Sequence, residues 1–225
     1  MKKLANRFVE FKGMTMLKLL LATGNAAKVR EYKLLLEGIP FEVVTVAEQG
    51  IEVEVSESGK TMEENATLKA LSYARLSNLL TLADDSGLEV DILGGEPGVM
   101  SARYAGAGAS DKDRIERLLN KLDDTPWEKR TARFRCVIAI AKPSGWVETC
   151  EGVCNGIVTF NPRGTSGFGY DPVFYLPQFG KTMAELSPEE KNDISHRGRA
   201  ARQARHILQR LFEEDRNTVK EGMSR

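Results

Sequence analysis

The N-terminal part of the chain alternates between a strand pattern and a helix pattern, and this order limits the folds that it can adopt. Residues 17–22 are a continuous apolar run interrupted only by Lys18, which is typical of a buried strand. Asn25 can then cap a helix that continues to about Leu36. Residues 41–46 are predicted to form the next strand. A strand, a helix and a strand in succession favour an α/β fold.

The rest of the chain adds further helices and a pair of strands. Apolar residues recur with a period of two over residues 131–141, and residues 147–158 are expected to pair with this strand. Helical spacing predicts helices over residues 61–74, 110–122 and 195–211, and Thr61-Met62-Glu63-Glu64 is a capping-box pattern at the start of the first. We therefore expect a mixed, twisted sheet with helices packed on it.

Composition and charge restrict the class of protein. The 225 residues are 41% hydrophobic and 28% charged, which is ordinary for a globular protein. The 32 basic and 32 acidic residues give a formal net charge of zero, so a chain-wide basic footprint for nucleic acid is missing. No apolar run has the length of a membrane span, and no secretory leader pattern precedes a cleavage site. We expect a cytoplasmic protein that binds neither nucleic acid nor membrane.

The sequence predicts one domain with a segment at each end. No linker rich in proline, glycine or serine and no internal repeat divides residues 16–212. Residues 1–15 show little periodicity and are interpreted as an N-terminal extension outside the fold. Residues 213–225 are charged and short of apolar groups, so we expect them to form a frayed C-terminal tail.

Two adjacent carboxylates are the most informative polar feature. Residues 84–87, Asp-Asp-Ser-Gly, follow the apolar run 79–83, which is predicted to be a buried strand that delivers its end to a cleft. A further short strand is expected over residues 88–92. Neighbouring ionised carboxylates repel each other unless they share a cation or a proton, and Mg²⁺ prefers such oxygen ligands. The alternative is a solvated turn, because all four residues favour turns.

A candidate phosphate-binding turn lies where the first strand gives way to the first helix. It consists of Thr23, Gly24, Asn25, Ala26, Ala27 and Lys28. Small residues let a ligand approach the backbone, and the free N–H groups at a helix start attract phosphate. Lys28 adds a positive charge, but the spacing of a P-loop is absent. An ordinary turn with a solvated lysine is the alternative.

Two later segments are candidates for binding a nucleobase. Glycines flank two aromatic residues in Phe168, Gly169, Tyr170 and Asp171. A base can stack on such a ring, and the carboxylate can accept hydrogen bonds from it. The last helix opens with His196 and Arg197, which Lys191 precedes, and a guanidinium suits carbonyl or phosphate oxygens. The alternatives are a core role for Phe168 and a capping or core role for His196.

Three more segments complete a recognisable pattern. They are Glu64-Asn65-Ala66, Leu93-Gly94-Gly95-x-Pro97-Gly98 and Ser101-Ala102-Arg103-Tyr104. Together with the four segments above, they occur in the order found in the inosine triphosphate pyrophosphatase family of bacterial type, the dITP/XTP pyrophosphatases. The chain resembles this family from about Leu17 to Leu211, and its N-terminal extension is the one departure.

The resemblance implies a fold and a reaction. The fold would be an elongated α/β structure, in which a long, mixed, twisted sheet with flanking helices forms two lobes around a nucleotide cleft. The implied assembly is a homodimer, and the implied cofactor is Mg²⁺. A non-standard purine nucleoside triphosphate (ITP, dITP or XTP) would react with water to give the monophosphate and pyrophosphate, which cleanses the nucleotide pool.

The resemblance also assigns roles to individual residues. Asp85 would be the general base and a metal ligand, with Ser86 beside the substrate. The second carboxylate ligand would be Glu57, with Glu54 as an alternative. The phosphates would be held by the turn from Thr23 to Lys28 and by Lys69, and the base by Phe168, Gly169, Tyr170, Asp171, Lys191, His196 and Arg197.

Substrate choice and two rival functions complete the expectations. Arg197 has only donors, so it would favour a base with a carbonyl at purine position 6 over one with an amine. A pyrophosphatase that acts on modified pyrimidines could share the fold. A purine-nucleotide-binding regulator without hydrolysis is the second rival, but the intact pair of Asp84 and Asp85 argues against it.

Overall fold

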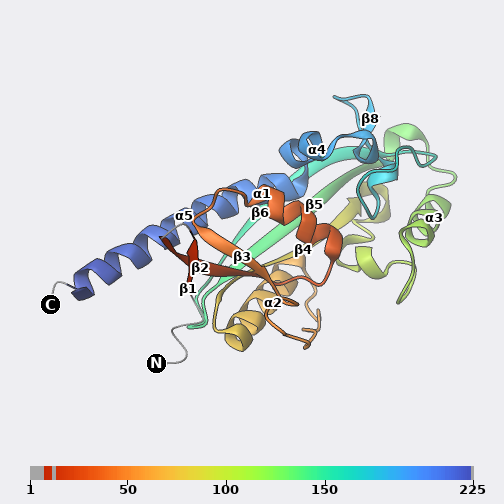
Figure 1. Cartoon of the computed structure of the whole chain (residues 1–225). Coiled ribbons are helices and arrows are strands. Elements are labelled where there is room, and N and C mark those ends of the chain that lie inside the picture. The colour runs from red at the N-terminus through yellow and green to blue at the C-terminus, as the bar shows by residue number, and fades with distance from the viewer. Residues whose placement is uncertain (1–7, 12–13, 224–225) are drawn as a thin grey trace.

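The chain forms one mixed β-sheet with helices on both faces (Figure 1). The computed structural model describes residues 8–11 and 14–223, and the side chains of residues 16–217. Within these residues eight strands pair in the order β1-β2-β4-β5-β6-β7-β8, and β3 also pairs with β2. The strands are β1 (Phe8–Phe11), β2 (Met14–Leu21), β3 (Phe41–Thr45), β4 (Leu80–Val90), β5 (Thr131–Ala141), β6 (Val147–Val158), β7 (Phe174–Leu176) and β8 (Lys181–Thr182). Parallel pairing of β2 with β3 and β4, and antiparallel pairing elsewhere, confirms the predicted mixed α/β sheet.

The helices begin where their capping residues predict. They are α1 (Ala26–Leu35), α2 (Met62–Ser77), α3 (Asp111–Lys121), α4 (Pro188–Ile194) and α5 (His196–Met223). The Asn25 side chain accepts hydrogen bonds from the first N–H groups of α1, and the Thr61 hydroxyl accepts one from Glu64 N–H in α2. The predicted capping box is only half formed, because the Glu64 carboxylate accepts from the N–H of Lys60 instead of Thr61. No helix in the described part of the chain combines the length and the apolar character that a membrane span requires.

Strand β4 runs further than the sequence pattern indicated. Its parallel pairing with β2 ends at Leu82, but its antiparallel pairing with β5 continues to Val90. Asp84 and Asp85 therefore lie within the strand and not at its end, and residues 88–90 belong to the same strand. The prediction of a strand end was wrong because β5 pairs with the polar residues as well as the apolar ones. Both carboxylates still lie past the end of the parallel ladder, which is where open α/β sheets bind ligands.

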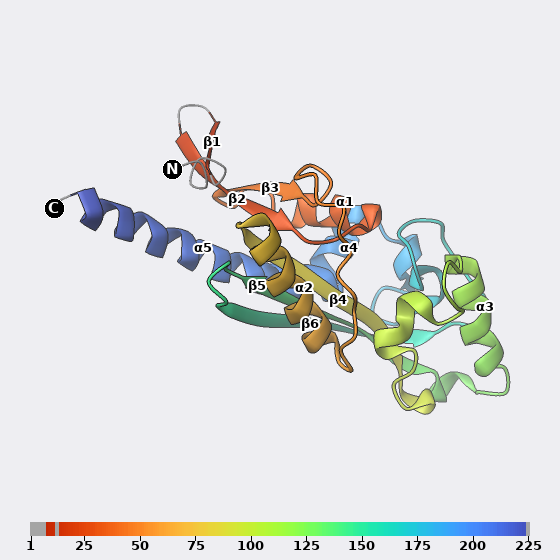
Figure 2. The ribbon, with the colours of Figure 1, turned by 90° about the horizontal axis from the view of Figure 1, so that it is seen from below.

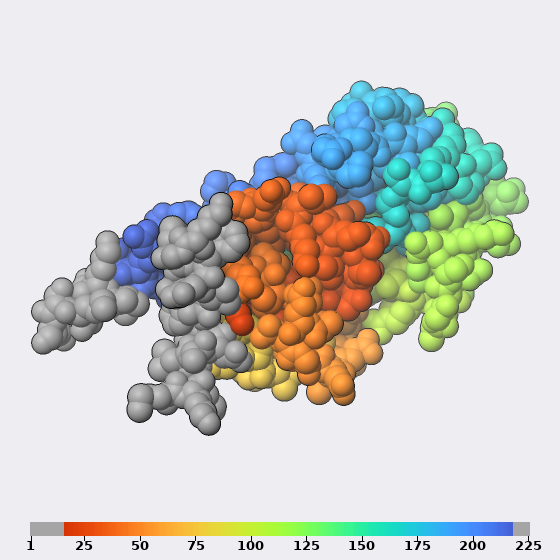
Figure 3. All heavy atoms as spheres, viewed as in Figure 1, coloured from red at the N-terminus to blue at the C-terminus, as the bar shows by residue number. Residues whose placement is uncertain are grey.

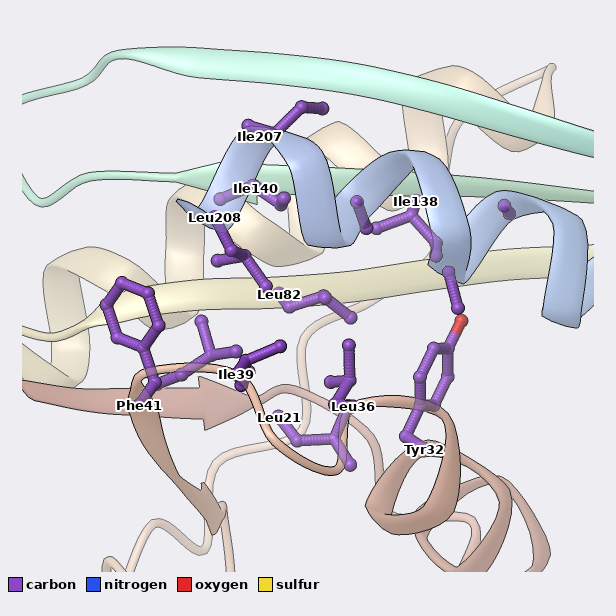
Figure 4. Close-up of a cluster of buried hydrophobic side chains, with 14 of the residues drawn as sticks. Leu21, Tyr32, Leu36, Ile39, Phe41, Leu82, Ile138, Ile140, Ile207 and Leu208 are labelled. Atoms are coloured by element: carbon purple, nitrogen blue, oxygen red, sulfur yellow. The ribbon is translucent and has the colours of Figure 1, made fainter. Parts of the chain in front are cut away.

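Two hydrophobic clusters cover opposite faces of the sheet. One packs between the sheet and helices α1 and α5, and it includes Leu82 and Ile138 (Figure 4). The other packs beneath α2 and includes Ala83 and Val137. Figure 2 shows α2 and α5 on the two sides of the sheet that these clusters imply. Successive strand residues point to opposite faces, so β4 contributes to both clusters in turn.

A third hydrophobic cluster forms the core of the lobe around α3. It gathers Leu88 from the end of β4, Leu118 from α3 and Phe174 from β7. In Figures 1 and 2 this lobe lies at one end of an elongated molecule, and the C-terminal end of α5 lies at the other. The two-lobed, elongated arrangement that the resemblance implied is therefore confirmed.

Both ends of the chain differ from the prediction. Residues 1–15 were expected outside the fold, but Phe8–Phe11 forms β1 and pairs with the first residues of β2, which starts at Met14. Backbone pairing needs no apolar periodicity, so the pattern could not reveal this hairpin. The expected frayed tail, residues 213–225, continues α5 as far as Met223, because its glutamate, arginine and lysine residues favour helix. Residues 1–7, 12–13 and 224–225 lie outside the described residues.

Candidate functional site

A cavity of about 610 Å³ lies between the two lobes, a volume typical of small-molecule sites. In the space-filling view, a groove runs between the orange surface of the N-terminal segments and the green surface around α3 (Figure 3). The predicted site residues that line the cavity are Thr23, Gly24, Asn25, Lys28, Glu54, Glu57, Lys69, Asp85, Ser86, Phe168, Gly169, Tyr170, Asp171, Lys191, His196 and Arg197. Ala26 and Ala27 do not line it; they form the first turn of α1.

Asp84 and Asp85 point to opposite faces of β4, so they do not form the shared pair that their adjacency suggested. Asp84 is almost completely buried, and its Oδ2 lies 2.9 Å from Lys28 Nζ and 3.6 Å from Arg197 Nε. Burial alone would raise the pKa of Asp84, but the charges of Lys28 and Arg197 hold it well below its usual range. Asp84 is therefore an ionised carboxylate that neutralises two cations on the α1 and α5 face.

Asp85 lies on the α2 face in a different environment. Its Oδ2 accepts a hydrogen bond from Asn65 Nδ2 at 3.0 Å, and its Oδ1 accepts one from Ser86 N–H at 2.9 Å. Burial raises the pKa of Asp85 above its ordinary value, against the charge of Lys69 and the hydrogen bond from Asn65. A partly buried carboxylate with a raised pKa at the wall of a cavity is suited to general-base chemistry.

Glu57 approaches the same region from the segment between β3 and α2. Its Oε1 lies 2.7 Å from Lys69 Nζ, and its Oε2 lies 3.6 Å from Arg103 Nη2. Lys69 also donates to the backbone carbonyl of Asp84. The charge of Glu57 acts on Asp85, which supports Glu57 as its neighbour in the cavity, and Glu54 lines the same cavity.

Asn65 joins the Glu57 segment to the general-base candidate, and its role was not predicted. Its Oδ1 accepts the N–H of Gly59 at 2.8 Å, while its Nδ2 donates to Asp85. A Cβ at position 59 would lie 2.7 Å from Asn65 Oδ1, so this contact requires glycine. Asn65 belongs to one of the segments that carried the family resemblance, but its amide could not be placed opposite Asp85 without the fold.

The residues present fit an open Mg²⁺ site. Among the residues that the structure describes, no cluster of three or more acidic, histidine or cysteine side chains is arranged as a metal cage. Asp85 and Glu57 line one cavity and offer carboxylate oxygens. Mg²⁺ is usually held by one or two carboxylates together with substrate phosphates, so this sparse donor set suits it.

The aromatic end of the cavity is built around Phe168. Lys191 Nζ lies 4.9 Å and the Arg197 guanidinium carbon 5.3 Å from the centre of its ring. The Asp171 carboxylate accepts the N–H of Phe168 at 2.9 Å and a hydrogen bond from Lys191 at 2.6 Å. Gly167 has a φ of +80°, and an added Cβ there would lie 2.1 Å from Asp171 Oδ2, so only glycine allows this turn.

Glu31 is a site residue that was not predicted. Its two carboxylate oxygens lie 2.7 Å from Lys191 Nζ and 2.6 Å from Arg197 Nη1. Burial would raise the pKa of Glu31, but the charges of Arg197 and Lys191 lower it. Glu31 lies three residues after Lys28 on α1, and this helical spacing is a signal that could have placed it beside the phosphate turn.

Arg197 is held by protein groups on several sides. Besides its contacts with Glu31 and Asp84, its Nη2 donates to Ser86 Oγ at 2.9 Å. These contacts tie α5 to α1 and β4, while the Nε of Arg197 has no hydrogen-bond partner among the described residues. The guanidinium of Arg197 thereby holds Ser86 and Glu31 in place close to the ring of Phe168.

His196 offers a neutral polar atom at the same end. Its ring stacks on Phe134, with ring centres 4.7 Å apart and an angle of 19° between the planes. Burial lowers the pKa of His196 well below its ordinary value, and the charges of Arg197 and Lys191 add to this effect. Its Nδ1 is buried and has no hydrogen-bond partner among the described residues.

Comparison with known proteins gives a consistent result. The sequence matches the Ham1 family over residues 19–207. It is 50% identical over 196 residues to the dITP/XTP pyrophosphatase of Desulforamulus reducens, covering 87% of this chain and 98% of that protein. It is 46% identical over 190 residues to the dITP/XTP pyrophosphatase of Bacillus subtilis, covering 84% and 96% of the two chains.

A solved structure supports the same relationship. The fold is similar to that of a HAM1 protein from Coxiella burnetii, with a TM-score of 0.79 and 42% identity, covering 86% of this chain and 98% of that one. Sequence and structure thus agree over nearly the whole length of these relatives. The resemblance that the seven segments indicated is confirmed, and the chain belongs to the Ham1 family.

Proposed function

We propose that the protein hydrolyses the non-standard purine nucleoside triphosphates ITP, dITP and XTP to their monophosphates and pyrophosphate. The observation that carries this proposal is that one cavity is lined by all the kinds of group that such a substrate needs. Lys28 and Lys69 offer positive charge for the phosphates, Asp85 and Glu57 offer carboxylates for the reacting phosphorus and a metal ion, and the ring of Phe168 offers a surface for the base. The names of the two pyrophosphatase relatives support it.

Asp85 would act as the general base. In the reaction, a water oxygen bonds to the α-phosphorus and the bond from that phosphorus to the bridging oxygen breaks. Asp85 takes the proton from the water, and pyrophosphate leaves. The burial that raises the pKa of Asp85 makes its carboxylate a better proton acceptor than a solvated one.

Mg²⁺ is the cofactor that the donor set fits, and Asp85 and Glu57 would hold it. When bound, it would neutralise phosphate charge and stabilise the leaving pyrophosphate. The N-terminal end of α1 and the Lys28 side chain would hold phosphate oxygens, in exchange for the hydrogen bonds that Asn25 accepts from the N–H groups of Ala27 and Lys28 and for the contact of Lys28 with Asp84. Lys69 pairs with Glu57, so its charge lies beside the proposed metal ligand and could also contact a phosphate oxygen.

The base would stack on Phe168 and meet polar groups at the cavity wall. A neutral His196 and the buried Lys191 line the same cavity as that ring, and a 6-oxo purine could form hydrogen bonds with them. Arg197 would act mainly by fixing Ser86 and Glu31 in place.

We also propose that the protein works as a homodimer in the cytoplasm. The family resemblance supports the dimer, and an enzyme of the free nucleotide pool acts where that pool is. Neither property changes the chemistry at the cavity.

A pyrophosphate-release assay tests the proposed function. Purified protein is incubated with ITP, XTP, GTP and ATP, each with Mg²⁺ and with excess chelator. We expect turnover of ITP and XTP to exceed that of ATP and GTP, and to require Mg²⁺. Equal turnover of all four substrates, or none, would contradict the proposal.

A further inference from the structure

A single carboxylate connects α3 to the loop that carries Phe168. Asp111 is the first residue of α3, and its Oδ2 accepts the backbone N–H of Gly169 at 2.7 Å. The two residues are 58 positions apart in the chain. Both line the cavity between the lobes. The contact is therefore a tie between separate segments at the edge of the site.

A second side chain fixes the position of Asp111. Its Oδ1 is paired with Arg114 Nη2. Arg114 Nη1 donates to the backbone carbonyls of Ala102 and Ala109, each at 2.8 Å. Because those carbonyls belong to the segment that leads into α3, the carboxylate is held by a guanidinium that is itself anchored on backbone. The result is a pre-organised acceptor facing Gly169.

The loop needs such a tie because its own backbone is permissive. Gly167 and Gly169 both have positive φ, of +80° and +61°. On the inner side, the loop is held by Asp171, which accepts the N–H of Phe168. On the α3 side, Tyr170 donates its hydroxyl proton to the Ser101 carbonyl at 3.0 Å. The N–H of Gly169, next to Phe168, is held by Asp111.

We infer that Asp111 is a positioning residue of the nucleotide site, which holds the Phe168 ring at the angle needed to stack on a base. The inference rests on the proposed function, since it assigns the ring a base to bind. Asp111 would act through Gly169 and would not touch the phosphates. Its loss should weaken binding of the nucleoside part and spare binding of the phosphate part.

A purely structural role makes a different prediction. An acidic residue in the first turn of a helix stabilises that helix through its dipole. Asp113 has the same role in the same turn, and it also closes the capping box with Ser110. Asp113 has no described contact with the Phe168 loop, so Asp113→Ala is a matched control for loss of charge and cap.

The test compares Asp111→Ala, Asp111→Asn and Asp113→Ala with the wild type. Calorimetric titrations with IMP and with inorganic pyrophosphate, both in Mg²⁺, separate the two parts of the site. We expect Asp111→Ala to raise the Kd for IMP at least about fivefold, because the variant loses a hydrogen bond to a charged acceptor. The Kd for pyrophosphate should change less than about twofold. Asp111→Asn keeps an acceptor oxygen for Gly169, so it should stay within about twofold of the wild type for both ligands.

The amide signal of Gly169 gives a readout that does not depend on binding. In nitrogen–proton correlation spectra, the Gly169 amide should shift and exchange faster in Asp111→Ala, and stay unchanged in Asp113→Ala. If Asp111→Ala fails to fold, Asp111→Asn and this amide signal still decide the matter. IMP binding that is fivefold weaker in Asp111→Asn would overturn the inference. It would also be overturned if IMP binding were lost in that variant while its Gly169 amide signal stayed unmoved.

The outcomes also separate this inference from the proposed function. The positioning role would be overturned if Asp111→Ala weakened the binding of IMP and of pyrophosphate equally. It would also be overturned if Asp111→Ala and Asp113→Ala weakened IMP binding equally. In both cases the wild-type turnover of ITP, and with it the proposed function, would still stand. In steady-state assays on ITP, the positioning role predicts that Asp111→Ala raises KM and leaves kcat nearly unchanged. Absence of ITP turnover in the wild type would instead overturn the proposed function.

Discussion

Two neighbouring carboxylates illustrate how single residues in this site differ in function. Asp84 is surrounded by Lys28 and Arg197, whose charges keep it ionised on one face of β4. Asp85 receives a hydrogen bond from Asn65 on the other face, and burial raises its pKa. Strand geometry separates the two because successive side chains point in opposite directions. Asp84 therefore holds two cations in place, and Asp85 is the carboxylate that we propose to act in the reaction.

Replacing Asp85 should remove activity without removing the fold. Asp85→Asn keeps the volume and one of the two acceptor oxygens, but it cannot take a proton, so turnover of ITP should fall by about a hundredfold or more. Its thermal midpoint should change little, because the loss of one hydrogen bond is offset by removal of a charge that burial disfavours. Asp193→Asn, at an exposed aspartate, is the control. Near wild-type turnover would remove Asp85 from its role.

Replacing Asp84 should lower the stability of the fold, unlike replacing Asp85. Asp84→Asn leaves Lys28 and Arg197 without their shared carboxylate, and breaking a buried ion pair lowers the free energy of unfolding by about 3 kcal/mol or more. The folded pKa of Asp84 lies below its unfolded value of about 3.9, so its stabilisation is present above that pH and is lost as pH falls through the folded value. Urea titrations should therefore show that the free energy of unfolding of Asp84→Asn is lower than that of the wild type at pH 7, and that this difference is smaller below pH about 4. A constant deficit would contradict this assignment.

At the scale of secondary structure, one close approach positions the start of α5. Gly152 lies on β6 beneath that helix, and an added Cβ would lie 2.1 Å from the His196 carbonyl oxygen and 2.5 Å from Ala200 N. Glycine thus lets the first turn of α5 rest on the sheet backbone. The same turn carries Arg197, which reaches Glu31 and Ser86. The sheet therefore sets the position of the base end of the cavity.

Gly152→Ala should displace that turn. We expect a drop in the free energy of unfolding of about 1–3 kcal/mol, typical of overpacking, together with a higher KM for ITP. Glu151→Ala changes an exposed neighbour on the same strand and serves as the control. Thermal unfolding and steady-state kinetics measure both effects. An alanine variant with unchanged stability and KM would show that α5 can shift without consequence.

The elements also show how far local pattern determines the fold. The apolar run before Asp84, the Asn25 cap of α1 and the period of two in β5 were each enough to predict the element that forms. The continuation of β4 through its polar residues depends on pairing with β5, about fifty residues away. The pairing of Glu31 with Lys191 and Arg197 depends on a similar long-range approach. Neither long-range pairing has a local signal; the helical spacing from Lys28 indicates only that Glu31 lies near the phosphate turn.

In the complete fold, the cavity lies between two lobes that have separate hydrophobic cores. One lobe rests on the clusters around α1, α5 and α2, and the other on the cluster around α3. Residues from Thr23 to Arg197 converge on the space between them. The segments that carry the site are far apart in sequence and meet only because the long strands β4, β5 and β6 span both lobes.

We expect the molecule to be a homodimer in solution. Multi-angle light scattering at micromolar concentration should give twice the chain mass of 24.9 kDa. The expectation comes from the family resemblance, and dimers of closed symmetry are the commonest assemblies of soluble proteins. A monomer mass across the micromolar range would contradict it.

The proposed reaction depends on where the water attacks, because the carboxylates must then lie at the α-phosphorus. Hydrolysis of ITP in water labelled with oxygen-18, followed by mass spectrometry of both products, tests it directly. Asp85 lines the same cavity as the phosphate turn and Phe168, and its proposed role as the base for attack at the α-phosphorus predicts one labelled oxygen in IMP and none in pyrophosphate. Label in pyrophosphate, or release of inorganic phosphate in place of pyrophosphate, would contradict it.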